Sequence, residues 1–352
     1  MRVILGSVMK AMVLRGTYDL FKNDAPLGLL EIPTPKPAEG EVLVRVLACG
    51  VCHTDMDEVE GRVIPPSLPI VPGHQAVGVV KEHGLGVRNF DVGDMVGVAW
   101  IGGVCGKCSY CSSGRENLCQ NFIATGRDRN GGFAEFMVAD AGFVHRIPEG
   151  MDPVKTAPLL CAGAIGYRCV RLSGITDGDA VGLMGFGASA HLVIQLLRHS
   201  YPLSEVYVFA RGEKERLFAM ELGASWSGGI EEHSPRQLSA IIDTTPAWKP
   251  VLRSLENLVP GGKLVVNAIS KENSDIDSLL SLDYQSHLWL EKEVKSVANV
   301  TREDVAGFLS AASTLGIEAE VTEYGLEEAN AALLEMRRGV GKGARVLKIA
   351  DR

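Results

Sequence analysis

The residues best suited to chemistry are eight cysteines, all in the first half of the 352-residue chain. Four of them follow the pattern C-x2-C-x2-C-x7-C, as Cys105, Cys108, Cys111 and Cys119. Four thiolates within fifteen residues suit a tetrahedral structural zinc site, which leaves no open position for chemistry. An iron–sulfur cluster also uses close cysteines, but its usual spacings differ and no proline follows Cys119. Disulfides or an empty loop are the remaining alternatives.

A second set of metal-ligand types is scattered along the same half. Cys52 lies in Gly-Val-Cys-His-Thr-Asp, His74 follows Pro72 and Gly73, and Cys161 comes much later. Two thiolates and one imidazole suit a catalytic zinc, because they leave a fourth position open for water or substrate. The spacing alone does not join these three residues. Taken singly, the cysteines fit a buried core, and His74 fits a hydrogen-bonded core histidine.

A glycine-rich turn begins at residue 185. It reads Gly185, Phe186, Gly187, Ala188, Ser189 and Ala190, follows an apolar run at 180–184 and precedes a helical pattern at 190–199. Glycines between strand and helix allow a cofactor pyrophosphate to approach the helix N-terminus. The motif predicts dinucleotide binding; the alternative is a packing turn.

The end of the next predicted strand, 206–210, bears on the choice of cofactor. NAD-selective sites usually place an acid there, for the ribose 2′-hydroxyl. This chain has Arg211 and Gly212 instead, so a 2′-phosphate meets no repulsion and Arg211 can bind it. The sequence favours NADP(H) over NAD(H). Lys214 and Arg216 can assist, although a solvated helix face explains both.

The predicted elements fall into two groups. Short strands bounded by glycine and proline fill the first 160 residues, whereas strands and helices alternate from 163 to about 298. Alternation predicts a parallel sheet covered by helices. Two helices, at 304–314 and 326–339, and a closing strand at 345–349 complete the chain. The first group is expected to contain strands at 9–13, 42–46, 76–80 and 95–99. The second group is expected to contain strands at 180–184, 206–210, 240–243 and 263–267, and a helix at 213–222.

Composition excludes several classes of partner. The net charge is -8 and the pI is about 5.6, with no basic arm for nucleic acid. No run of about 20 apolar residues would cross a membrane, and residues 1–14 lack the continuous apolar core of a secretory signal. Clustered cysteines without such a signal indicate a reducing, cytoplasmic location.

The motifs GVCHTD, PGHQ, the four-cysteine cluster, LLCAG and GFGASA occur in the order of a known family. The chain resembles the zinc-containing medium-chain alcohol dehydrogenases, and most closely their cinnamyl-alcohol-dehydrogenase-like group. The resemblance covers all but the first eight residues. It implies an α/β plus β fold: a GroES-like catalytic domain at 1–162 and 299–352, with its zinc lobe at about 102–120, and a Rossmann domain at 163–298.

The resemblance also implies an activity and roles for single residues. The activity is reversible oxidation of a primary or secondary alcohol to an aldehyde or ketone, by a cytoplasmic homo-oligomer, dimer or tetramer, with one catalytic and one structural zinc per chain. Cys52, His74 and Cys161 would hold the catalytic zinc, which lowers the pKa of bound oxygen and so permits hydride release near neutral pH. Thr54 would bind the substrate oxygen, and Asp55 would orient His74. The cofactor would contact His53, Asn267, Ala268, Ile269 and Arg345. Trp100, Phe122 and Trp289 are candidates for an apolar substrate wall, and plain core packing explains them equally well.

The chain departs from the family at two positions. Many members have glutamate where this chain has Gln75, and histidine where it has Asp57. Gln75 supplies no charge beside the metal, and Asp57 or solvent would end the proton relay. Two rival functions share the fold: a zinc-free quinone or enoyl reductase, which would not need Cys52, His74 and Cys161, and a dinucleotide-binding protein without turnover.

Overall fold

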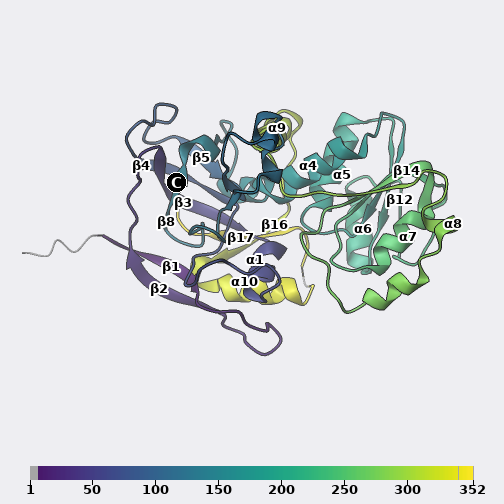
Figure 1. Cartoon of the computed structure of the whole chain (residues 1–352), viewed down its shortest axis with the longest axis horizontal. Helices are drawn as coiled ribbons and strands as arrows, with labels where there is room; N and C mark the ends of the chain where they lie inside the picture. The colour runs from purple at the N-terminus through teal and green to yellow at the C-terminus, as the bar shows by residue number, and fades with distance from the viewer. Residues whose placement is uncertain (1–6, 340, 352) are drawn as a thin grey trace, which may run out of the picture. The chain divides into compact units, whose positions relative to one another are not determined.

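The computed structural model describes residues 7–339 and 341–351, and the chain forms two compact units (Figure 1). Unit 1 comprises residues 1–161, 300–310 and 319–352, and unit 2 comprises residues 162–299 and 311–318. Each unit has its own sheet and its own buried apolar core.

Unit 1 is built on a mixed sheet with the strand order β16-β17-β3-β4-β5-β9, and β8 pairs with β3. Only β16 and β17 run parallel; the other pairs are antiparallel. Two small ladders, β1-β2 and β6-β7, complete it. Its strands are β1 (Val8–Leu14), β2 (Leu27–Pro33), β3 (Glu41–Val51), β4 (Ala76–His83), β5 (Met95–Val98), β6 (Ile101–Gly103), β7 (Ile123–Ala124), β8 (Phe136–Asp140), β9 (Val144–Arg146), β16 (Val321–Gly325) and β17 (Ala344–Lys348).

The helices of unit 1 are short, and most of them lie in the connections between strands. They are α1 (His53–Val59), α2 (Ser109–Ser112), η1 (Glu116–Leu118), η2 (Ala141–Phe143), α3 (Pro153–Thr156), η3 (Ala157–Leu160), η5 (Leu326–Glu328) and α10 (Ala329–Arg337). Helix α9 (Arg302–Leu315) begins in unit 1 and ends in unit 2.

Unit 2 is a parallel six-stranded sheet with the order β12-β11-β10-β13-β14-β15. This order runs outward in both directions from β10, as in Rossmann folds, where the ligand binds at the carboxyl ends of the strands near the switch. Helices border the sheet, with α6 against β11 and β12 and α7 against β13 and β14 (Figure 1). The elements are α4 (Ala162–Ser173), β10 (Ala180–Met184), α5 (Ala190–Ser200), β11 (Glu205–Phe209), α6 (Glu213–Glu221), β12 (Trp226–Gly228), β13 (Leu238–Asp243), α7 (Lys249–Asn257), β14 (Leu258–Val266), η4 (Ile276–Ser281), α8 (Tyr284–His287) and β15 (Glu293–Ser296).

The predicted α/β plus β fold is confirmed, and the strongest local patterns coincide with real elements. The apolar run 180–184 is β10, with all five residues buried, and the amphipathic pattern from 190 is α5. Strands β2, β6, β7, β8, β9, β12, β15 and β16 were not predicted. In β15 every residue is exposed, so it carries none of the buried apolar pattern by which strands are found in sequence.

Among residues 7–339 and 341–351, no helix is long and apolar enough to cross a membrane.

Candidate metal centres and cofactor turn

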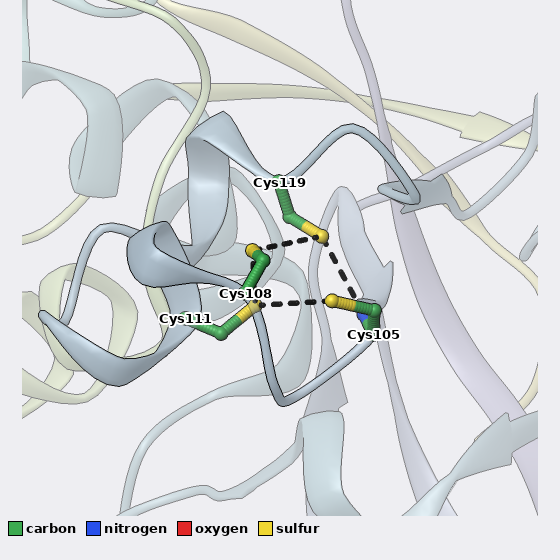
Figure 2. Close-up of side chains that lie close together, drawn as sticks. All are labelled: Cys105, Cys108, Cys111 and Cys119. Atoms are coloured by element: carbon green, nitrogen blue, oxygen red, sulfur yellow. Dashed lines mark hydrogen bonds between the residues drawn. The ribbon is translucent and has the colours of Figure 1, made fainter.

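The four-cysteine cluster converges in unit 1 (Figure 2). The Sγ–Sγ distances are 3.5 Å between Cys108 and Cys111, 3.8 Å between Cys108 and Cys119, and 3.9 Å between Cys105 and Cys111. A tetrahedron with Zn–S bonds of about 2.3 Å has edges of about 3.8 Å. A disulfide would bring two sulfurs to about 2.05 Å. The distances therefore fit four zinc ligands, and none of the eight cysteines, all of which lie in the described part of the chain, forms a disulfide.

Local structure also prepares this cluster for a cation. Backbone N–H groups of Lys107 and Cys108 lower the pKa of the Cys105 thiol to about 6. The backbone N–H of Cys105 lies 3.5 Å from the Cys119 sulfur. N–H dipoles aimed at sulfur favour the thiolate, which is the form that binds metal.

The first residue of the second set is placed by the end of a strand. Cys52 follows β3 and is the N-cap of α1, with extended backbone at φ -123° and ψ 159°. Its N–H donates to Asp55 Oδ2 at 2.7 Å, which closes a capping arrangement over the first turn. The thiol is thereby fixed at the helix start, 3.8 Å from the Thr54 hydroxyl oxygen.

His74 is positioned by the turn that precedes β4. Gly73 has φ +98°, and a Cβ there would lie 2.4 Å from a Phe133 ring carbon, so only glycine fits. The His74 ring is fully buried and meets the edge of Trp100 at 4.8 Å between ring centroids. Its Nδ1 lies 3.1 Å from Asp55 Oδ1. Because a carboxylate only accepts, Nδ1 carries a proton, and in the neutral ring the lone pair is therefore on Nε2.

The lone pair of His74 points to a position shared with two sulfurs. His74 Nε2 is buried and has no hydrogen-bond partner among the described residues. Cys52, His74 and Cys161 offer ligand atoms that all lie within 4.8 Å of one another. A hydrogen bond from the Cys161 thiol, with help from His74, lowers the pKa of the Cys52 thiol in spite of burial. A buried orphan nitrogen beside two sulfurs fits a metal with a free coordination position.

Asp57 lies two residues beyond Asp55 on α1. Arg62 binds it through Nε and Nη2, both 2.6 Å from Asp57 Oδ1. Both of these contacts fall on Oδ1 and not on Oδ2. Burial raises the pKa of Asp57 to about 6, and Arg62 opposes the rise. Asp57 is therefore a carboxyl that can take up a proton near neutral pH.

Glu58, the next residue, was not identified as functional in the sequence. It is fully buried, and both carboxylate oxygens lack a hydrogen-bond partner among the described residues. The sequence did offer one signal for Glu58: it is an acid three residues after Asp55, between Met56 and Val59. Positions three apart lie on one side of a helix, so Glu58 was expected on the side of Asp55.

The glycine turn of unit 2 follows β10 as predicted. Gly185 has φ +85°, and a Cβ there would lie 2.8 Å from Thr244 Oγ1. Gly187 is exposed, with no atom within 4 Å of an added Cβ. Phe186 is buried and packs on Phe218. The space at Gly187 fits the close approach of a pyrophosphate to the start of α5.

Asn267 is tied to this turn. Its Nδ2 donates to Ser189 Oγ at 3.3 Å, and Ser189 donates to the Ala162 carbonyl at 2.7 Å. Ala268 and Ile269 follow at the carboxyl end of β14, and Ile269 is 46% exposed. The structure thus brings the segment that was expected to contact the cofactor next to the glycine turn.

Arg211 follows Ala210 at the end of β11 and is exposed. No described residue is hydrogen-bonded or ion-paired to its guanidinium. Arg216 is committed elsewhere, since its Nη1 donates to the carbonyls of Ala210 and Arg211 at 3.2 Å. Gly212 caps α6, with its N–H donating to Glu215. Arg211 is therefore a cation at this strand end that is open to a ligand.

The remaining predicted residues are spread over both units. Arg345 of β17 is paired in register with Val51, one residue before Cys52, and its Nε is buried without a partner in the described chain. His53 is exposed and Phe122 is half-buried, both in unit 1. Trp289, in unit 2, is 53% exposed beside Tyr284. The metal ligands belong to unit 1, whereas the glycine turn, Arg211 and Asn267 belong to unit 2.

Comparisons with known proteins identify the family of this chain. The family profile described as alcohol dehydrogenase GroES-like domain matches residues 38–149. A Mycobacterium tuberculosis protein named "Probable alcohol dehydrogenase AdhA" is 39% identical over 332 residues, covering 93% of this chain and 94% of the relative.

Two solved structures are similar over nearly the whole chain. The cinnamyl alcohol dehydrogenase SbCAD4 from Sorghum bicolor has a TM-score of 0.84 at 26% identity, covering 97% of this chain and 98% of that one. A Sinorhizobium meliloti 1021 protein described as a "putative zinc-binding dehydrogenase", solved with NADP bound, has a TM-score of 0.84 at 25% identity, covering 97% of this chain and 99% of that one. This chain therefore belongs to the zinc-type medium-chain alcohol dehydrogenases, in their cinnamyl-alcohol-dehydrogenase-like group, and is an oxidoreductase.

Proposed function

We propose that this enzyme interconverts primary or secondary alcohols with aldehydes or ketones, using NADP(H) and a zinc ion held by Cys52, His74 and Cys161. The observation that carries the proposal is the buried, unpaired Nε2 of His74 beside two cysteine sulfurs. A zinc-free reductase would have no use for this ligand set. Metal analysis combined with NADPH oxidation over a panel of aldehydes and ketones tests it. We expect two zinc ions per chain and turnover that disappears when one is removed.

The residues around the proposed metal centre have different roles. When bound, zinc supplies Lewis acidity, and the dinucleotide supplies or accepts hydride. Asp55 holds the His74 ring in the ligating tautomer through the 3.1 Å contact at Nδ1. Thr54 donates to, or accepts from, the substrate oxygen and passes its proton on. Trp100, against His74, excludes water from one side of the ring.

We assign the end of the proton path to Asp57. Its Oδ1 is held by Arg62, and its Oδ2 is left to exchange a proton. With a pKa raised to about 6, Asp57 is ionised above that pH and can accept the proton that an alcohol loses. Below it, Asp57 is protonated and the path is blocked.

Asp57→Asn is expected to lower kcat for alcohol oxidation by about 10²-fold, the lower range for general-base catalysis. In the unchanged enzyme, kcat should fall as the pH drops through about 6. The variant should lose that inflection. The measurement is kcat against pH from 5 to 9 for both proteins. An identical pH profile in the variant would mean that solvent, not Asp57, takes the proton.

We infer a preference for NADP(H) from Arg211, supported by the NADP-bound S. meliloti relative. Charge-assisted hydrogen bonds to a 2′-phosphate are worth roughly 1.5–3 kcal/mol, or about one to two decades in affinity. Arg211→Ala should therefore raise KM for NADP(H) by about 10- to 100-fold and leave KM for NAD(H) unchanged. Lys214→Ala, which removes an exposed cation from the same segment, is the matched control. It should change the ratio of KM for NADP(H) to KM for NAD(H) little. Equal ratios in Arg211→Ala and the unchanged enzyme would refute the assignment.

We also propose that the enzyme is a homo-oligomer assembled through the edge of the unit 2 sheet. Within the described part of the chain, β15 pairs only with β14, and all four of its residues are exposed, including Val294 at 51%. Leu290, also 51% exposed, precedes it. An open strand edge with apolar neighbours suits pairing with a second copy. Light scattering should give at least twice 37.7 kDa, and Val294→Lys should shift it toward the monomer. A 37.7 kDa particle for the unchanged protein would contradict this.

A further inference from the structure

Glu58 is the most anomalous charged group of unit 1. Its side chain is completely buried, and neither carboxylate oxygen has a hydrogen-bond partner among the described residues. Buried polar groups almost always have partners, because burying an unpaired polar group is costly and burying an unpaired charge far more so. An acid retained in such a place calls for a compensating positive charge.

The position of Glu58 relates it to the metal centre. It lies three residues after Asp55 on α1, so the two acids share one side of the helix. Asp55 contacts His74 directly. The charges that act on Glu58 are those of Asp55, His74, Cys52 and Arg127, and burial is the largest influence, raising the pKa of Glu58 well above its usual range.

The protein cations nearby are engaged with other acids. Arg127 binds Asp128, with Nε and Nη2 both 3.0 Å from Oδ1. Arg62 binds Asp57 and Glu60, and Arg337 binds Glu60 at 3.1 Å. Gln75, which is buried next to His74 in the chain, carries no charge. A divalent cation held by Cys52, His74 and Cys161 is the positive charge that the surroundings of Glu58 otherwise lack.

We propose that Glu58 is a positioning residue for the catalytic metal: its buried carboxyl strengthens cation binding at Cys52, His74 and Cys161 without contacting the substrate. This inference rests on the proposed metal centre. Residues beyond the direct ligands commonly change metal affinity by about 10- to 100-fold when substituted. The same carboxyl destabilises the metal-free protein, because its charge or its proton then has no partner.

The experiment is a chelator titration of the zinc-loaded protein, with metal content measured after each step. The four-cysteine cluster is the internal reference, because its ion is held independently. Glu58→Gln and Glu58→Met should both release the second ion, the one at Cys52, His74 and Cys161, at a free chelator concentration about 10- to 100-fold lower. The four-cysteine cluster should keep its ion. Glu58→Asp, which keeps the charge, should restore most of the affinity. In the metal-free state, Glu58→Met should melt at a higher temperature than the unchanged protein.

Glu60→Gln is the matched control. Glu60 is a mostly buried acid at the end of the same helix, but two arginines neutralise it. Removing its charge should leave release of the second ion unchanged. Equal metal retention in Glu58→Gln and the unchanged protein would overturn the role of Glu58 and leave the proposed metal centre standing. Loss of affinity in Glu58→Met but not in Glu58→Gln would also overturn it, since shape rather than charge would then be responsible. An unchanged protein that holds one ion per chain would instead overturn the metal centre itself.

Discussion

Replacing Cys161 by serine is expected to remove one of two zinc ions and to lower kcat/KM for alcohol oxidation by at least about 10³-fold. Zinc lowers the pKa of bound water from about 16 to about 7, which corresponds to roughly 12 kcal/mol at about 1.36 kcal/mol per unit. Forfeiting only a third of this, about 4 kcal/mol, already gives a 10³-fold loss. Serine keeps the shape of the side chain but does not supply a thiolate.

Cys169→Ala is the control for this prediction. Cys169 is fully buried on α4 of unit 2 and is not part of either ligand set. Its replacement should leave two zinc ions and near-normal turnover. Metal content and kcat/KM, measured on the same samples of both variants, test this prediction. A Cys161→Ser enzyme that keeps both two ions and full activity would show that Cys161 is not a ligand.

Replacing Cys108 by serine is expected to affect stability rather than chemistry. Cys108 contacts the sulfurs of Cys111 and Cys119 at 3.5 and 3.8 Å, so its loss opens the cluster. Loss of a structural metal belongs to the small class of changes that cost about 4–5 kcal/mol. Helix α2, which begins directly after Cys108, has no buried residue that would hold this part of the loop otherwise.

The readouts are zinc content and the chelator dependence of thermal unfolding. Cys108→Ser should hold one ion, melt at a lower temperature, and no longer respond to chelation of the cluster. Ser112→Ala, an exposed position in the helix α2 that Cys108 caps, should behave as the unchanged protein. A Cys108→Ser protein with the same melting temperature and two ions would refute a structural zinc at this cluster.

Local sequence patterns predicted some features well. The spacing of Cys105, Cys108, Cys111 and Cys119 predicted one cluster because ligands within a single loop need no knowledge of the fold. The glycine turn after β10 was predictable because strand, turn and helix are consecutive. The charge pattern at Arg211 was visible for the same reason.

Features made by distant segments were beyond local patterns. Cys52, His74 and Cys161 come from three separate connections, and only the resemblance to a family joined them. The engagement of Asp57 by Arg62 depends on a turn after α1 that no periodicity describes. Glu58 is polar by type, so its complete burial could be seen only in the structure. The edge strand β15 is exposed throughout, and its sequence carries no strand signal.

The most direct test of the metal centre is anomalous X-ray scattering from crystals of the zinc-loaded enzyme, collected on both sides of the zinc absorption edge. We predict two peaks per chain. One should lie among the sulfurs of the four-cysteine cluster, and the other should lie within bonding distance of Cys52 Sγ, His74 Nε2 and Cys161 Sγ. A single peak, confined to the four-cysteine cluster, would contradict a zinc-dependent mechanism for this chain.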